Sequence, residues 1–169
     1  MARSQPRPLY TPEEKVRRDE SPWTIVQGVL APLQFVVMIV SVVLLVRYLG
    51  TGEGASAAAV SVVVKTAVLY LIMITGSIWE KVVFGKWLFA GPFFWEDVVS
   101  MGVMALHTAY LVGLVIPFTS SVGLAWLALV AYAAYTVNAI QFVLKLRAAR
   151  RQSEEIERSQ NAELAGMVS

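Results

Sequence analysis

Cysteine is absent from the 169-residue sequence, and histidine occurs once, as His107. The lack of cysteine excludes disulfides, thiolate nucleophiles, iron–sulfur clusters and thiolate zinc sites. A single imidazole likewise cannot build a metal site from several histidines. The chain also has no GxxxxGK[ST] motif and no strand-to-helix GxGxxG motif, so nothing in it supports nucleotide-driven chemistry.

Charge is scarce as well. Charged residues make up 15% of the chain, against about 25% in soluble domains, and 57% of its residues are hydrophobic. Lys, Arg, Asp and Glu are missing from residues 21–46 and 98–144, and residues 55–79 contain only Lys65. Because a membrane-spanning helix needs about 20 apolar residues, each stretch is long enough to cross a bilayer. The sequence is therefore that of an integral membrane protein.

The uncharged stretches predict an all-α fold, an integral membrane bundle of four transmembrane helices. Residues 98–144 are long enough for two of these helices, which we expect to be separated near Pro117. The expected spans, which together form the transmembrane domain 23–144, are residues 23–48, 57–78, 98–116 and 124–144.

Two polar segments flank the transmembrane domain. In the N-terminal segment, 1–22, the residues Thr11, Pro12 and Glu14 are typical of a helix capping box, which predicts a short surface helix. The charged C-terminal tail, 145–169, is expected to be helical only in part.

Lys and Arg gather on one side of the predicted bundle. Five lie in the N-terminal segment, two in the loop 79–97 and five in the tail, whereas the other two loops together contain only Arg47. Cytoplasmic loops of membrane proteins collect positive charge, so both termini and the loop 79–97 are expected in the cytoplasm. The net charge of +2 is therefore interpreted as a consequence of how the chain is oriented in the membrane, and we expect no nucleic-acid partner.

Small residues mark one face of the third predicted span. Ala105, Ala109 and Gly113 recur every four residues. This spacing lets the backbone of another helix approach closely. The pattern indicates tight packing within one bundle or between copies of the chain, so a homo-oligomer is compatible with it.

Two ionisable residues lie inside predicted spans, where a charge at the bilayer centre costs about 2.5–3.5 kcal/mol. Lys65 either extends its long side chain toward the membrane surface or serves a function. His107 either hydrogen-bonds to a neighbouring helix, or acts as an axial ligand for the metal of a flat tetrapyrrole or as a proton carrier. The sequence leaves these alternatives open.

Acidic residues flank the loop 79–97 at both ends. Glu80 ends the second span, and Glu96 and Asp97 open the third, so the three carboxylates are expected to meet at one level, close to water. Glu96 and Asp97 can also be explained as acids that complement the N-terminal helix dipole, an explanation that does not apply to Glu80. Aromatic residues in the loop would partly desolvate the carboxylates, which favours the protonated form that a general acid needs.

Several strings of residues in the chain are long and unusual. They are Pro8-Leu9-Tyr10-Thr11-Pro12, Ser21-Pro22-Trp23-Thr24 with Gln27-Gly28-Val29-Leu30-Ala31-Pro32, Trp79-Glu80-Lys81-Val82-Val83-Phe84-Gly85, Phe93-Phe94-Trp95-Glu96-Asp97-Val98 and Leu106-His107-Thr108-Ala109-Tyr110. Together they resemble the 3-vinyl bacteriochlorophyllide hydratase family of bacteriochlorophyll biosynthesis. The resemblance covers about residues 8–147, and the rest of the tail adds nothing to it.

The resemblance implies a hydro-lyase that adds water to the C3 vinyl group of chlorophyllide a or of a vinyl bacteriochlorophyllide and forms the 3-(1-hydroxyethyl) product. Hydration is not a redox reaction, so we expect no cofactor and no protein-bound metal. The implied partners are the Mg-tetrapyrrole substrate, water and membrane lipid, and association with a second copy or with neighbouring pathway enzymes is compatible with them. The implied location is the bacterial inner, photosynthetic membrane, with the active side facing the cytoplasm.

For this reaction the carboxylates have complementary roles. We expect Glu96 or Asp97 to donate a proton to the terminal vinyl carbon and Glu80 to activate the water. His107 would handle the pigment or a proton. Eleven residues of helix separate Glu96 from His107, about 16 Å along the axis, which favours the carboxylates as the reacting groups.

Five further residues are candidates for binding the substrate. Lys81 or Lys86 would pair with the carboxylate of the pigment, because a carboxylate needs a cationic partner. Trp79, Trp95 and Tyr110 would contact the apolar macrocycle.

Two other functions use the same features. A non-catalytic pigment-binding or assembly protein would use the same apolar slot and His107 but would need no acid. A small four-helix transporter would couple ions through Glu80 or Lys65. For a transporter we expect a carboxylate deep inside a span, whereas every acidic residue here lies at an edge, in a loop or in a tail.

Overall fold

The computed structural model describes residues 9–168, which contain α-helices, one short 3₁₀ helix and no strand. Four of the helices are long and apolar enough to cross a membrane. These findings confirm the all-α fold with four transmembrane helices. The elements in chain order are α1 (Pro12–Glu20), α2 (Pro22–Thr51), α3 (Ala55–Phe84), η1 (Gly91–Phe93), α4 (Phe94–Val115) and α5 (Ser121–Val168).

Local sequence signals set several helix ends. Thr11 Oγ1 accepts a hydrogen bond from the Glu14 backbone N–H, and the Glu14 carboxylate accepts one from the Thr11 N–H, which completes a capping box at the start of α1. The Ser21 hydroxyl accepts from the backbone N–H of Trp23 at the start of α2. α2 ends at Gly52, whose φ of 75° lies in the left-handed region that favours glycine.

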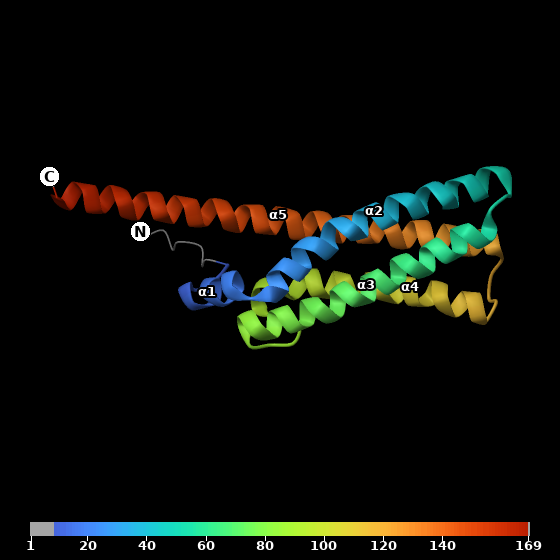
Figure 1. The fold of residues 1–169 in the computed structure, drawn as a ribbon, viewed down its shortest axis with the longest axis horizontal. Coiled ribbons are helices and arrows are strands. Elements are labelled where there is room, and N and C mark those ends of the chain that lie inside the picture. Colours follow the sequence, from blue (N-terminus) through green and yellow to red (C-terminus); the bar gives the residue numbers. More distant parts are fainter. Residues whose placement is uncertain (1–8, 169) are drawn as a thin grey trace, which may run out of the picture.

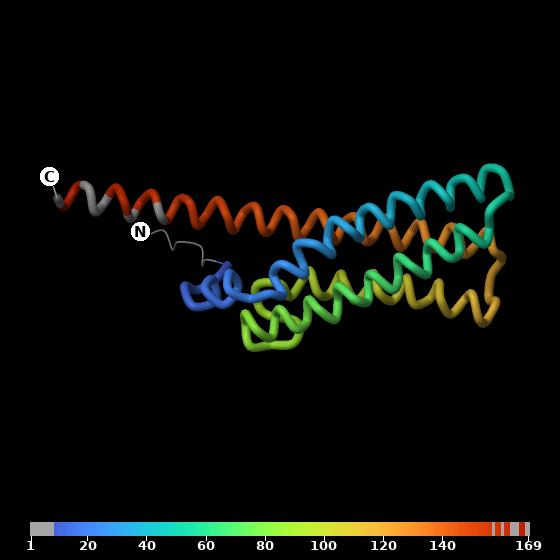
Figure 2. Tube along the Cα trace, in the orientation of Figure 1, coloured from blue at the N-terminus to red at the C-terminus, as the bar shows by residue number. Residues whose placement is uncertain are grey.

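The four long helices lie side by side and alternate in direction (Figure 1). The Cα trace runs away from α1 along α2, returns along α3, leaves again along α4 and returns along α5 (Figure 2). The loop between α3 and α4 therefore lies at the same end of the bundle as α1 and the outer half of α5. This end, which we call the α1 end, carries Glu80, Glu96 and Asp97.

The tail differs from the expectation of partial helix. α5 is one helix of 48 residues that projects well beyond the bundle (Figure 1). Interactions one turn apart support its projecting part: Arg150 Nε donates to Glu154 at 3.1 Å, and Ser153 Oγ donates to the Ala149 carbonyl at 3.1 Å. An ion pair such as Arg150–Glu154 stabilises a helix by about 0.2–0.5 kcal/mol, so a charged sequence need not end it.

Lys65 lies in the interior of the bundle. Its side chain is fully buried, its Nζ donates a hydrogen bond to Gln34 Oε1, and the same Nζ lies 3.8 Å from the centroid of the Tyr135 ring. These contacts on α2 and α5 hold the ammonium group between helices. The alternative in which Lys65 reaches for the membrane surface is therefore wrong.

Gly113 allows the closest approach of α4 to the start of α5. A Cβ atom there would lie 2.5 Å from Leu124 Cδ2 and 2.9 Å from Phe118 Cε1, whereas a Cβ at Gly102 on the same helix would meet nothing within 4 Å. We expect Gly113→Leu to lower the free energy of unfolding by about 1–3 kcal/mol through overpacking, measured as a lower melting temperature in detergent. Gly102→Leu is the matched control, and an equal loss in both variants would contradict this packing.

Candidate active site

Two buried carboxyl groups meet at the α1 end. Glu80 lies in the last turns of α3 and is 5% exposed, and Asp97 lies in the first turn of α4 and is 3% exposed. The two side chains lie close enough to interact electrostatically. We call Glu80 and Asp97 the carboxyl pair.

The loop between the two helices holds each member of the pair through a backbone N–H group. The Phe89 N–H donates to Asp97 Oδ2 at 2.8 Å, and the next N–H, of Ala90, donates to Glu80 Oε2 at 3.1 Å. Phe89 has a φ of 57°, a left-handed conformation that is an outlier for a bulky residue. Backbone strain of this kind clusters at functional sites, where the surrounding structure maintains it. Here the conformation of Phe89 directs two consecutive backbone N–H groups, of Phe89 and Ala90, toward Asp97 and Glu80.

The contact between the two acids has a chemical consequence. An ionised carboxylate is only an acceptor, so two carboxyl groups can hydrogen-bond to each other only when one of them carries a proton. Two adjacent buried carboxylates repel each other, which favours a state in which one of them carries a proton, and that proton then belongs to the pair rather than to either residue. Such a unit can give a proton to a substrate and take one from water.

Glu96 lies beside the pair but has a different partner. Its Oε2 accepts from Lys145 Nζ on α5 at 2.6 Å, and the side chains of Glu96 and Lys145 are 11% and 27% exposed. The same Nζ lies 5.3 Å from the centroid of the Phe93 ring. This ion pair links the start of α4 to α5. The sequence alone did not single out Lys145, although it is the first charged residue after the uncharged residues 98–144.

An aromatic layer covers the same end of the bundle. Phe93 lies at its centre, with ring centroids 5.7 Å from Trp79, 5.8 Å from Phe84, 5.8 Å from Phe142 and 6.5 Å from Tyr10. We call these five residues the aromatic layer. It joins the segment before α1 to α3, η1 and α5.

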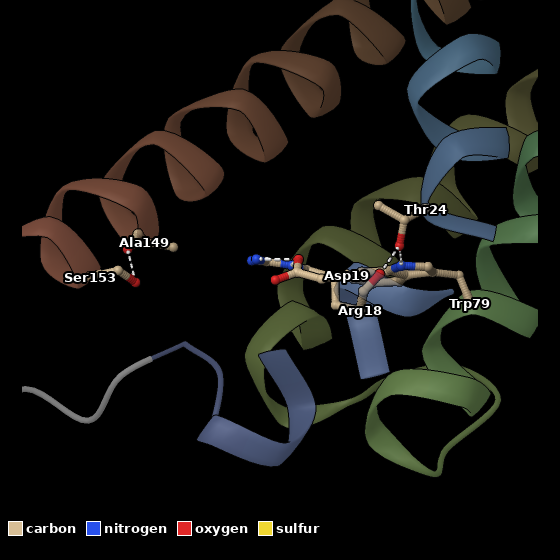
Figure 3. Close-up of polar contacts among 6 residues, drawn as sticks. All are labelled: Arg18, Asp19, Thr24, Trp79, Ala149 and Ser153. Carbon is tan, nitrogen blue, oxygen red and sulfur yellow. Dashed lines mark hydrogen bonds and ion pairs between the residues drawn. The ribbon is translucent and has the colours of Figure 1, made fainter. Parts of the chain in front are cut away.

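Trp79 also fixes α3 to the start of α2. Its Nε1 donates to Thr24 Oγ1 at 2.9 Å, and Thr24 Oγ1 donates in turn to the backbone carbonyl of Arg18 at 2.6 Å (Figure 3). Arg17 adds a further bond, from its Nε to the Val83 carbonyl at 2.9 Å. α1 is therefore held against the C-terminal end of α3.

The other predicted binding residues lie in different surroundings. Lys81 is exposed, and its Nζ donates to the Gly85 carbonyl at 2.9 Å. Lys86 is exposed in the loop, and Trp95 is 72% exposed on the outer face of α4. Tyr110 is buried in the hydrophobic core, four turns of α4 away from the carboxyl pair.

His107 is not brought to the carboxyl pair. It is fully buried, ten residues along α4 from Asp97, which is about 15 Å of helix. Its Nδ1 is 2.9 Å from the Val103 carbonyl, and its ring centroid is 5.7 Å from that of Tyr132. Its Nε2 has no hydrogen-bond partner among the described residues. Among the side chains that the structure describes, no three His, Cys, Asp or Glu residues are grouped so that they could hold a metal ion.

Comparison with known proteins gives concordant matches. A family model described as 2-vinyl bacteriochlorophyllide hydratase matches residues 10–148. A curated protein of that name from Rhodobacter capsulatus is 59% identical over 145 residues, which cover 86% of this chain and 84% of the relative. Another of that name, from Cereibacter sphaeroides, is 57% identical over 150 residues, which cover 88% of this chain and 92% of the relative. No solved structure matches the chain.

Proposed function

Because this chain belongs to the 2-vinyl bacteriochlorophyllide hydratase family, it is a hydro-lyase that acts on a vinyl group in bacteriochlorophyll biosynthesis, and we propose that Glu80 and Asp97 form its acid–base site. The observation that carries the proposal is that consecutive backbone N–H groups, of Phe89 and Ala90, hold two buried carboxyl groups next to each other. The substrate is a chlorophyllide-type pigment, and the second substrate is water.

The proposed reaction begins with proton transfer from Asp97 to the terminal carbon of the C3 vinyl group. The conjugated macrocycle delocalises the positive charge that forms on the carbon next to the ring. Water then attacks this carbon while Glu80 accepts a proton from the water, which gives the 1-hydroxyethyl group. Because Glu80 and Asp97 are held next to each other, that proton can return to Asp97, so the pair ends the cycle with the proton count at which it began.

Glu96 has a supporting role in this proposal. Sequence reasoning offered Glu96 and Asp97 equally as proton donors. The 2.6 Å ion pair with Lys145 engages the Glu96 carboxylate, while Asp97 lies next to another acid, so Asp97 is the better donor. Glu96 then fixes α4 against α5, and His107, which lies about three helical turns away, takes no part in proton transfer.

The pigment is proposed to lie at the lipid-facing rim of the α1 end. The aromatic residue Trp95, 72% exposed next to Glu96, and the aromatic layer that contains Trp79 offer apolar surface to a flat macrocycle. Exposed Trp95 would contact lipid and pigment alike, as aromatic residues at membrane interfaces do.

We propose that the membrane is the bacterial inner membrane and that the α1 end faces the cytoplasm. The support is the distribution of positive charge: Arg17 bonds to the end of α3, Lys145 lies beside the carboxyl pair, and Arg150 follows on the projecting part of α5, all at this end. The opposite end carries Arg47 alone, in a 3.6 Å ion pair with Glu53.

Isotope labelling tests the reaction directly. Purified protein in detergent, supplied with chlorophyllide a in H₂¹⁸O, is expected to form a more polar pigment that contains one ¹⁸O atom. In D₂O the methyl carbon of the new 1-hydroxyethyl group is expected to carry one deuterium that does not exchange, because the first step protonates that carbon. Mass spectrometry of the pigment checks both labels. Binding of pigment without any labelled product would contradict the hydratase function.

A further inference from the structure

A groove with basic walls opens at the α1 end, outside the aromatic layer. It has a volume of about 410 Å³ and lies between α1 and the outer half of α5. Its lining includes Tyr10, Lys15 and Arg18 on one side and Leu146, Ala149 and Arg150 on the other. We call it the basic groove. Neither the carboxyl pair nor any residue expected from the sequence to bind substrate belongs to it.

Positive charge dominates the lining. Lys15, Arg18 and Arg150 face one acidic lining residue, Glu154, which pairs with Arg150 at 3.1 Å. Arg18 pairs with its neighbour Asp19 at 2.6 Å, and its side chain is 28% exposed. Figure 3 shows the Arg18 guanidinium pointing from α1 toward the part of α5 that carries Ala149 and Ser153. An anionic group in the groove would therefore meet cations from both walls.

The floor of the groove connects it to the carboxyl pair. The Arg18 guanidinium lies over the Tyr10 ring, 4.7 Å from its centroid. Tyr10 belongs to the aromatic layer and contacts Phe93, and Phe93 in turn lies under Lys145, the partner of Glu96. Tyr10 and Phe93 thus link the basic groove to the ion pair of Glu96 with Lys145, which begins next to Asp97 in the chain.

We propose that the basic groove binds the free carboxylate of the pigment substrate, with Arg18 as its main partner. This inference rests on the proposed function. It assigns Arg18 as the residue through which the enzyme prefers the free acid to an ester of the pigment. A chlorophyllide is a large apolar disc with one carboxylate arm. A guanidinium binds a carboxylate with two parallel hydrogen bonds, a geometry that a lysine cannot supply. Leu146 and Ala149 give the groove an apolar side for the edge of the macrocycle.

This assignment differs from the expectation that Lys81 or Lys86 binds the carboxylate. The Lys81 ammonium already donates to the Gly85 carbonyl and lies 5.9 Å from the centroid of the Trp87 ring. In the basic groove Arg18 and Arg150 also have partners, Asp19 and Glu154, but there cations from two helices converge on one space. The groove is smaller than a whole chlorin disc, so it holds the arm and leaves the macrocycle against the aromatic layer and the lipid.

The test compares chlorophyllide a with its methyl ester on the full-length protein in nanodiscs of neutral lipid. Wild-type protein is expected to have a lower KM for the free acid than for the ester. Arg18→Gln is expected to raise the KM for the free acid by about 10- to 100-fold, the usual value of a charge-assisted hydrogen bond, with little change in kcat and no change for the ester. Arg150→Gln, on the opposite wall, is expected to show a smaller effect of the same kind. Arg47→Gln at the other end of the bundle is the control.

Three results would overturn the proposal. If Arg18→Gln raised the KM for the acid and the ester equally, Arg18 would act in the packing of α1 and not in binding the carboxylate. If the KM values of Arg18→Gln and Arg150→Gln were both unchanged, the groove would take no part in substrate binding. A KM that follows the anionic lipid content of the nanodisc, with no difference between acid and ester, would make a lipid phosphate the occupant and would likewise reject it. Failure of the acid–base site is distinguishable, because it appears in kcat for acid and ester alike.

Discussion

Glu80→Gln and Asp97→Asn are each expected to lower kcat for hydration by about 100- to 10,000-fold, the usual contribution of general acid–base catalysis. The amide oxygens of Gln and Asn still accept the hydrogen bonds from the Ala90 and Phe89 N–H groups, so the loop keeps its place. Neither amide can transfer a proton, however. Steady-state turnover of chlorophyllide a, with pigment binding followed by absorbance, separates the loss of kcat from a loss of binding.

The controls for this prediction use acids and a histidine that lie elsewhere. Glu53→Gln changes an exposed acid at the opposite end and is expected to leave kcat unchanged. His107→Gln is expected to lower kcat much less than either change in the carboxyl pair, because His107 lies about 15 Å of helix away. Full turnover by both carboxyl variants would reject the acid–base assignment. An inactive His107→Gln protein that still folds and binds pigment would instead place the acid–base site at His107, inside the bundle.

The second large effect is expected at the ion pair between Glu96 and Lys145. Lys145→Met leaves the Glu96 carboxylate largely buried without its partner, and we expect the free energy of unfolding to fall by about 2–4 kcal/mol, since both side chains keep some contact with water. Adding Glu96→Gln to Lys145→Met removes the unpaired charge and is expected to restore most of the loss. Denaturant unfolding in mixed micelles measures the wild-type protein and both variants.

The double variant decides how the ion pair acts. If the double variant were no more stable than Lys145→Met alone, the loss would come from the lysine stem and its contact with Phe93 rather than from the charge. Turnover provides a second readout. The double variant is expected to retain turnover within about tenfold of wild type, because Glu96 positions α4 and the carboxyl pair remains intact.

The sequence was sufficient to predict features that depend on local signals. Runs without charge set the number of spans, and Thr11 with Glu14 set the start of α1. The position of Glu80 and Asp97 on either side of one short loop was sufficient to predict that they approach each other, since both helices end at the same membrane level. The family resemblance was carried by long strings of residues and is confirmed by the relatives.

Features that depend on the rotation of a helix about its axis, or on contacts between distant residues, could not be predicted from the sequence. The helices are apolar on all sides, so no polar face shows which way Lys65 points, and its position facing Gln34 and Tyr135 is set by packing. The ion pair of Glu96 with Lys145 joins residues that are 49 positions apart. The basic groove depends on α1 folding back against α3, a contact that only tertiary structure supplies.

A structure of the inactive Asp97→Asn variant with chlorophyllide a bound tests the central claim most directly. The account predicts that the terminal carbon of the C3 vinyl group lies within about 3–3.5 Å of the side chain at position 97, with the Glu80 carboxylate facing the inner vinyl carbon from which the water adds. A vinyl group held elsewhere, for example beside His107 with the carboxyl pair still closed on itself, would contradict it.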